Sequence, residues 1–204
     1  MSRTPEEREE YYYQNRERYN DLKTYYDGTP DVDLASLFIY LNKTCFNGLY
    51  RVNAKGKFNA PSGKYKHPLI CDRENILAVS ERLQGVKIVC GDYRESEDFI
   101  DGNTFVYFDP PYRPLTTTAA FTEYTAGRFN DENQKELAGY VRRLSEKGAK
   151  VAVSNSDPRN SDPEDDFFDV LYEGNSVERV SANRMVNAKG SARGRVNELL
   201  IRNY

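Results

Sequence analysis

The second half of the chain alternates short apolar runs with longer amphipathic stretches. The apolar runs are rich in β-branched and aromatic residues, which is typical of β-strands, whereas the amphipathic stretches have a helical period. We predict strands at residues 86–90, 104–108, 150–155, 167–172 and 195–202, and helices at residues 73–84 and 131–146. Strands that alternate with helices favour a mostly parallel sheet, so we expect an α/β fold from residue 73 onward.

Two helices are predicted before this region. Residues 5–25 have a helical composition, and Asp27-Gly28-Thr29-Pro30 ends that helix. A second helix is expected to begin near residue 33, with Asp31 or Asp33 as its N-cap.

A β-hairpin is predicted after the second helix. Residues 49–53 and 57–60 are strand-like segments on either side of a turn that contains Gly56. We therefore expect a helical and hairpin lobe over residues 1–72 and an α/β part over residues 73–204.

The composition is that of an ordinary soluble globular domain, with 38% hydrophobic and 30% charged residues. No apolar run approaches the roughly 18 residues of a membrane helix, and the N-terminus has no secretory signal. Three cysteines form neither a metal box nor a disulfide framework, so we expect a reducing, cytoplasmic location. His67 is the single histidine, which excludes most hydrolase triads and zinc sites. We expect His67 and the cysteines to be structural.

The net charge of −3 hides an uneven distribution. Residues 42–73 hold seven Lys and Arg against a single acid, Asp72. A second basic cluster comprises Arg179, Arg184, Lys189, Arg193 and Arg195. A local positive field attracts a polyanion such as nucleic acid, although such clusters can also be solvated surfaces.

The tetrapeptide Asp109-Pro110-Pro111-Tyr112 follows the predicted strand at 104–108. Active sites of open α/β sheets lie at the carboxyl ends of strands. The Asp109 carboxylate and the Pro110 carbonyl could accept hydrogen bonds from an amino group on a base, free its lone pair for methylation and stabilise the positive charge that develops. The fixed φ of proline keeps the carbonyl in place, and the Tyr112 ring could stack on a base removed from a duplex. The alternative is a proline-terminated strand with a capping aspartate.

The sequence resembles the Dam-type DNA adenine N6-methyltransferases over essentially the whole chain. Residues 41–53, 56–59 and 61–65 are similar to the target-recognition hairpin of that family. Residues 109–115 and 120–124 are similar to its catalytic loop and to the segment that closes behind the target base. The resemblance implies catalytic roles for Asp109, Pro110, Pro111 and Tyr112. Phe121 and Tyr124 could line the target pocket, and the alternative is that they only pack the loop.

For DNA, the resemblance implies that Arg51 reads a guanine through two hydrogen bonds in the major groove. Phe46 would wedge into the base stack, with Asn47 beside it. Phosphate contacts, which set register rather than sequence, are implied for Lys43, Lys55, Lys57, Lys64 and Lys66.

Further contacts with neighbouring bases are implied for Leu49 and Pro61, and Tyr65 would support a base or backbone contact. The alternative for Phe46 and Leu49 is the core of the hairpin, because large apolar side chains are usually buried.

S-adenosylmethionine is the cofactor that the resemblance implies, with Asp92, Tyr93 and Asp109 as contacts and no metal. The glycine-rich Phe-x-Gly-x-Gly loop of the family does not occur in this sequence, whose 13 glycines are scattered. We therefore expect a partial Rossmann-like class I methyltransferase sheet, in which the family order 3-2-1-4-5-7-6 lacks strands 1 and 2. On this expectation the chain is truncated, or a second chain supplies the missing strands, and its activity alone is in question because sheet edges stay unpaired.

The implied function is N6-methylation of a flipped adenine in a short duplex site such as GATC. Two alternatives stay open from the sequence. One is a catalytically incompetent DNA-binding fragment that keeps the hairpin. The other is an amino-methyltransferase that acts on cytosine N4 or on guanine N2 of ribosomal RNA.

Overall fold

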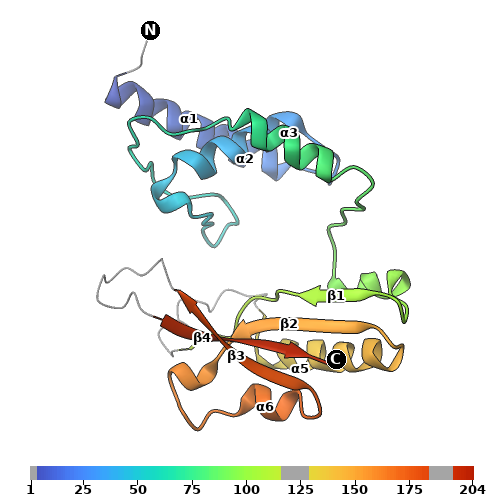
Figure 1. Ribbon diagram of the computed structural model, residues 1–204. Coiled ribbons are helices and arrows are strands. Elements are labelled where there is room, and N and C mark those ends of the chain that lie inside the picture. Colours follow the sequence, from blue (N-terminus) through green and yellow to red (C-terminus); the bar gives the residue numbers. More distant parts are fainter. Residues whose placement is uncertain (1–3, 116–128, 184–194) are drawn as a thin grey trace. The chain divides into compact units, whose positions relative to one another are not determined.

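The computed structural model describes residues 4–115, 129–183 and 195–204, which form two compact units, Met1–Cys90 and Gly91–Tyr204 (Figure 1). The helices and strands of the first unit are α1 (Pro5–Thr24), α2 (Val32–Thr44), the 3-10 turn η1 (Phe46–Gly48) and α3 (Arg73–Arg82). Those of the second unit are η2 (Tyr93–Phe99), β1 (Phe105–Phe108), α5 (Asp131–Glu146), β2 (Lys150–Ser156), η3 (Pro158–Asn160), α6 (Phe167–Leu171), β3 (Ser176–Asn183) and β4 (Arg195–Arg202). The boundary predicted at residue 72 separates a DNA-binding lobe from a catalytic part by function, and it stays a prediction.

The predicted helices at the start of the chain are confirmed. Thr4 and Glu7 form a capping box at the start of α1, and Asp31 caps α2 by accepting a hydrogen bond from the backbone N–H of Leu34. The core of this unit buries Tyr12, Tyr19, Leu37, Leu41, Cys45, Phe58 and Ala60.

The predicted hairpin is present, and side chains of α1 help to hold it. A single bridge pairs Val52 with Phe58, across a turn in which Gly56 has a φ of 72°. The buried Asn20 side chain accepts from the Phe58 N–H at 2.7 Å and donates to the Phe58 carbonyl at 3.1 Å. The Tyr12 hydroxyl donates to the Ala60 carbonyl at 2.9 Å. These helix side chains satisfy buried backbone groups of the second arm that do not bond to the first arm.

The second unit contains a four-stranded sheet in the order β1-β2-β4-β3. β1 and β2 are parallel, with Phe108 opposite Val153, whereas β4 is antiparallel to both β2 and β3. The expectation of a mostly parallel sheet is therefore wrong for the strands that the structure describes. A mixed α/β class is confirmed.

One face of the sheet packs against α5 and α6 (Figure 1). The core beneath it joins apolar side chains of α5, β2, α6 and β4: Leu137, Tyr140, Val141, Leu144, Val151, Val153, Phe168, Leu199 and Ile201. On the opposite face, Phe105 and Tyr107 of β1 are 60% and 55% exposed. Alternation along β1 thus places Tyr107 away from the helical core and next to the strand end that carries Asp109.

Two of the predicted strands are wrong. Residues 86–90 have no regular secondary structure and pair with no described strand, and a strand without a hydrogen-bonded partner is not stable. Residues 167–171 form α6 instead of a strand. Phe168 and Tyr172 are buried and Val170 is 62% exposed, which is the i, i+4 spacing of a helix and not the alternation of a strand.

Strand β3 is absent from the sequence-based prediction, because its alternation is interrupted by a charge. Arg179 lies on the same side of β3 as the core residue Val177 and forms ion pairs with Asp157 and Asp169. An inward-facing arginine is tolerated there because two carboxylates neutralise it.

None of the helices in the described ranges is long and apolar enough to cross a membrane. Cys45 is buried, in agreement with a structural role, whereas Cys71, Cys90 and His67 are exposed. A structural role for these three exposed residues stays a prediction.

Candidate active site and recognition hairpin

The Asp109–Tyr112 loop begins where β1 ends. Two consecutive prolines lack the N–H groups that a sheet ladder needs, and proline at 110 keeps Asp109 extended, so the strand stops after Phe108. Asp109 is exposed, as is Pro111, and Tyr112 is 37% exposed. The alternative of an aspartate that caps a local turn is not supported, since the carboxylate bonds to a different strand.

That bond comes from Ser154 on β2. The Ser154 hydroxyl donates to Oδ1 of Asp109 at 2.9 Å, and the Tyr107 hydroxyl donates to the Ser154 oxygen at 2.9 Å. No described residue donates to Oδ2 of Asp109. One carboxylate oxygen is therefore fixed by the protein, and the other can accept a hydrogen bond from a substrate.

Tyr112 lies beside the same serine. Burial is the main cause that raises the pKa of its hydroxyl, and a hydrogen bond with Ser154 works in the opposite direction. The tyrosine is therefore neutral at physiological pH. Its role as a stacking surface for a base stays a prediction.

Arg113 anchors the far end of the loop, a role that no sequence motif indicated. Its guanidinium donates to Asp131 at 2.9 Å and to Asp165 at 2.7 Å, and it lies 4.3 Å from the centre of the Phe167 ring. Burial opposes the charge of Arg113, but the hydrogen bonds that Arg113 donates to the two carboxylates outweigh it and raise its pKa. The loop is thus tied to the starts of α5 and α6.

The two predicted cofactor contacts near residue 92 have different surroundings. Asp92 caps η2, and the Arg94 guanidinium donates to both of its oxygens at 2.7 and 2.8 Å. Hydrogen bonds from Arg94 lower the pKa of Asp92 to about 2. The Tyr93 ring packs edge-on against Tyr140 and Phe108 in the core. Their contact with a cofactor stays a prediction.

The predicted DNA-contacting residues are all exposed on the first unit, where solvent or a ligand can reach them: Lys43, Phe46, Asn47, Leu49, Arg51, Pro61, Lys64 and Tyr65. Phe46 is 55% exposed and Leu49 is 48% exposed, so the alternative that these two form the hairpin core is wrong. Phe58 fills that core instead.

The side chains of Arg51, Tyr65 and Lys64 have intramolecular partners. Arg51 donates from Nε to the Asn59 side-chain oxygen at 2.9 Å and from Nη2 to the Asn59 carbonyl at 3.0 Å. The Tyr65 hydroxyl accepts from the N–H of Asn47 at 3.1 Å, and Lys64 forms an ion pair with Glu9. Phe121 and Tyr124 lie outside the described residues.

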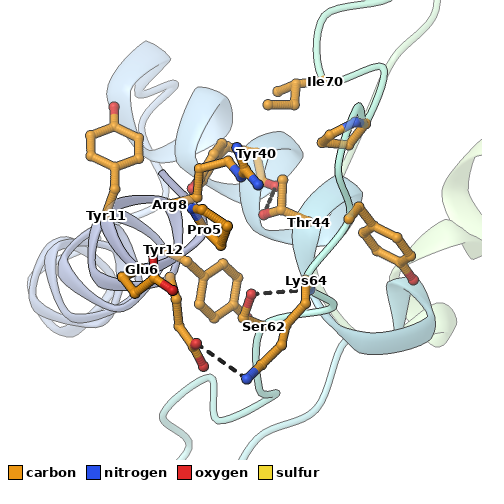
Figure 2. Close-up of a pocket in the computed structure, with 13 residues that line it drawn as sticks. Pro5, Glu6, Arg8, Tyr11, Tyr12, Tyr40, Thr44, Ser62, Lys64 and Ile70 are labelled. Carbon is orange, nitrogen blue, oxygen red and sulfur yellow. Dashed lines mark hydrogen bonds and ion pairs between the residues drawn. The ribbon is translucent and has the colours of Figure 1, made fainter. Parts of the chain in front are cut away.

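A cavity of about 550 Å³ lies in the first unit, between the start of α1 and the segment that follows the hairpin (Figure 2). Its walls are mostly aromatic and charged, and include Tyr11, Tyr12, Tyr40 and Lys64. None of the residues of the Asp109 loop lines it. This cavity therefore does not mark the candidate active site, which we place at the Asp109 carboxylate.

Comparison with known proteins gives a consistent result. Residues 2–186 match the family described as D12 class N6 adenine-specific DNA methyltransferase. The chain is 47% identical over 205 residues to type II methyltransferase M.MjaIII of Methanocaldococcus jannaschii, an alignment that covers 100% of this chain and 68% of that protein. It is 39% identical to type II methyltransferase M1.LlaDCHI of Lactococcus lactis, over 98% of this chain and 68% of the relative.

A third relative is the DNA adenine methylase of Escherichia coli K12, which is 35% identical over 94% of this chain and 64% of its own length. The family description and these relatives agree with the chemistry expected of a carboxylate followed by two prolines and a tyrosine. The chain belongs to the D12 class of N6 adenine-specific DNA methyltransferases.

Proposed function

We propose that the Asp109 loop catalyses transfer of a methyl group from S-adenosylmethionine to N6 of an adenine that has been flipped out of duplex DNA. The observation that carries this proposal is the Asp109 carboxylate: it is exposed at the end of β1, one oxygen is held by Ser154, and the other has no donor in the described part of the chain. A carboxylate with one oxygen held by the protein and the other open to a ligand suits a substrate N–H donor.

The physical argument concerns the nucleophile. The exocyclic nitrogen of adenine shares its lone pair with the ring, so it attacks poorly. Hydrogen bonds from its two N–H groups to Asp109 Oδ2 and to the Pro110 carbonyl would draw the nitrogen toward a tetrahedral geometry. Both acceptors also stabilise the positive charge that develops on nitrogen during attack, and they are in place before the reaction.

S-adenosylmethionine supplies an electrophilic methyl group when it is bound. The chemistry of the acceptors at the end of β1 fits the amino group that receives this methyl. We propose that Asp92 and Tyr93 contact the adenine end of the cofactor. Both oxygens of Asp92 accept hydrogen bonds from Arg94, so Asp92 would bind the cofactor either beside Arg94 or after Arg94 has moved away.

For target recognition we propose the hairpin lobe, residues 1–72, acting on a short duplex site such as GATC. Arg51 supports this proposal by its geometry. Asn59 occupies the Nε side of the guanidinium and leaves Nη1 and the outer hydrogen of Nη2 unused, which is an edge that can donate two hydrogen bonds to a guanine.

For architecture we propose that β1, β2, β4 and β3 correspond to strands 4, 5, 7 and 6 of the class I methyltransferase sheet. The observed order and the single antiparallel insertion of β4 support this correspondence. β1 has a partner on one side only among the described strands, and we propose that its other edge can take a strand from a second chain.

The function is tested by incubating the chain with S-adenosylmethionine and a duplex that contains GATC, then measuring modified nucleosides by mass spectrometry. We expect N6-methyladenine, and none with Asp109→Ala, whose duplex affinity should match that of the wild type. Duplex binding without any methylation would identify a binding fragment instead. Methylated cytosine, or guanine methylated in RNA, would overturn the adenine assignment.

A further inference from the structure

A chain of side-chain amides joins β2 and α5 to the catalytic loop. The Asn155 side-chain oxygen accepts from the N–H of Arg113 at 3.0 Å and from the N–H of Ser156 at 2.9 Å. The Asn155 amide nitrogen donates to the Gln134 side-chain oxygen at 3.1 Å. The Gln134 amide nitrogen then donates to the carbonyl of Pro111, also at 3.1 Å.

The direction of this chain is fixed. Two backbone N–H groups can face only an acceptor, so they hold the oxygen of Asn155 toward the loop and turn its nitrogen toward Gln134. Gln134 must then present its oxygen to Asn155, which leaves its nitrogen for Pro111. Each amide has a single orientation that satisfies all its partners.

Both amides are buried, at 0% exposure for Asn155 and 1% for Gln134. Hydrogen-bonded amides give a core little more stability than apolar side chains of the same shape, yet a broken chain would leave buried polar groups without partners. Their value to the protein is therefore a defined geometry, and that geometry ends at the catalytic loop.

We propose that Asn155 and Gln134 are positioning residues that aim the Pro110 carbonyl at the amino group of the target base. This inference rests on the proposed function. Gln134 fixes the Pro111 carbonyl, and the ring of Pro111 locks the φ angle between that carbonyl and the preceding peptide group. The neighbouring Pro110 carbonyl, which receives no hydrogen bond from a described residue, is consequently held in one direction.

The other proposed acceptor, the Asp109 carboxylate, is held by the same strand, β2. Ser154 holds the Asp109 carboxylate, the adjacent Asn155 holds the N–H of Arg113, and Ser156 donates to the Arg113 carbonyl at 2.6 Å. Three consecutive residues of β2 therefore set the spacing between the Asp109 carboxylate and the backbone of its loop. A base amino group needs both acceptors at once, so this spacing matters for the rate more than for binding.

The test compares Gln134→Glu, which keeps an acceptor for Asn155 but loses the donor to Pro111, with Gln134→Met, which loses both. Gln84→Met, at an exposed glutamine of α3's C-terminal turn, is the matched control. We expect both Gln134 variants to lower kcat on the order of 10- to 100-fold, with KM for DNA and for S-adenosylmethionine within about twofold of wild type. The control should be unchanged.

Asn155→Asp keeps the acceptor for Arg113 but cannot donate to Gln134. It should give a similar loss of kcat, and the Asn155→Asp, Gln134→Met double variant should lose little more than either alone, because one chain is broken in each case. Variants that methylate normally, that lose only affinity, or whose losses multiply would overturn the inference.

Failure of the proposed function can be told apart from failure of this inference, because in the first case the wild-type chain itself does not methylate DNA. In that event amide hydrogen exchange in the intact chain still decides the inference. The N–H group of Arg113, which donates to Asn155, should exchange about tenfold faster in Gln134→Met than in the Gln84→Met control, while the amides of β2 and β4 stay protected. Equal exchange at Arg113 would contradict a positioning role, and lost protection across β2 and β4 would indicate a purely structural one.

Discussion

The Ser154 hydroxyl donates a 2.9 Å hydrogen bond to Oδ1 of Asp109, across the parallel pair β1 and β2. The Tyr107 hydroxyl in turn donates to Ser154, so a short relay on the face of the sheet opposite the core of the second unit orients the carboxylate. This relationship makes the direction of Asp109 a property of the sheet and not of the loop alone.

Ser154→Ala should therefore lower the rate of methyl transfer. We expect a loss of about tenfold in single-turnover rate from a carboxylate that is less well aimed, and a smaller loss for Tyr107→Phe, which leaves the serine in place. The check is a rapid-quench measurement with excess enzyme, with Ser80→Ala on α3 as the control. Wild-type rates in both variants would show that the relay does not position Asp109.

Asn59 should contribute to base reading through Arg51. Arg51→Ala is expected to cost about 1–3 kcal/mol of discrimination at one base pair. Asn59→Ala should lose part of the same discrimination, because the guanidinium is then free to rotate. Competition binding with duplexes that differ at one pair gives the measurement.

Lys55→Ala serves as the comparison for these hairpin variants. It should weaken binding uniformly across sequences and reduce the salt slope by about 1, as expected of a phosphate contact. An Asn59→Ala variant that behaves like Lys55→Ala would contradict a role in base reading.

The Asp92 carboxyl should titrate with a pKa of about 2, because hydrogen bonds from Arg94 favour its charged form. A depressed pKa contributes stability that is present above the unfolded value of roughly 3.9 and is lost as the pH falls toward about 2. Arg94→Ala should return the pKa toward the ordinary value. Carbon-detected NMR of the carboxyl group measures both, and an unchanged midpoint in Arg94→Ala would rule out this cause.

The helix α1 should stabilise the hairpin through hydrogen bonds as well as packing. Asn20→Ala leaves the N–H and the carbonyl of Phe58 without their buried partner, and we expect a loss of about 2–3 kcal/mol in the free energy of unfolding. Tyr12→Phe removes only the hydroxyl that reaches Ala60 and should cost about 1 kcal/mol. Urea unfolding monitored in the first unit tests both. Equal stability of wild type and Asn20→Ala would mean that water replaces the asparagine.

The sequence by itself determined the local elements and the chemistry. Helical periodicity and capping residues placed α1, α2, α3 and α5, because these signals act within a few residues along the chain. Asp109-Pro110-Pro111-Tyr112 located the end of β1 and the carboxylate that we propose for catalysis, since a proline pair ends a strand wherever it occurs.

Tertiary structure decided which segments became strands and how the loop is held. Residues 86–90 have a strand-like composition but lack a described partner, while β3 forms despite its inward Arg179 because β4 pairs with it and two carboxylates neutralise the charge. The contacts of Asp109 with Ser154, and of the loop with Asn155 and Gln134, join residues 23 to 45 positions apart. No local pattern encodes such contacts, because they exist only once the sheet and α5 have packed together.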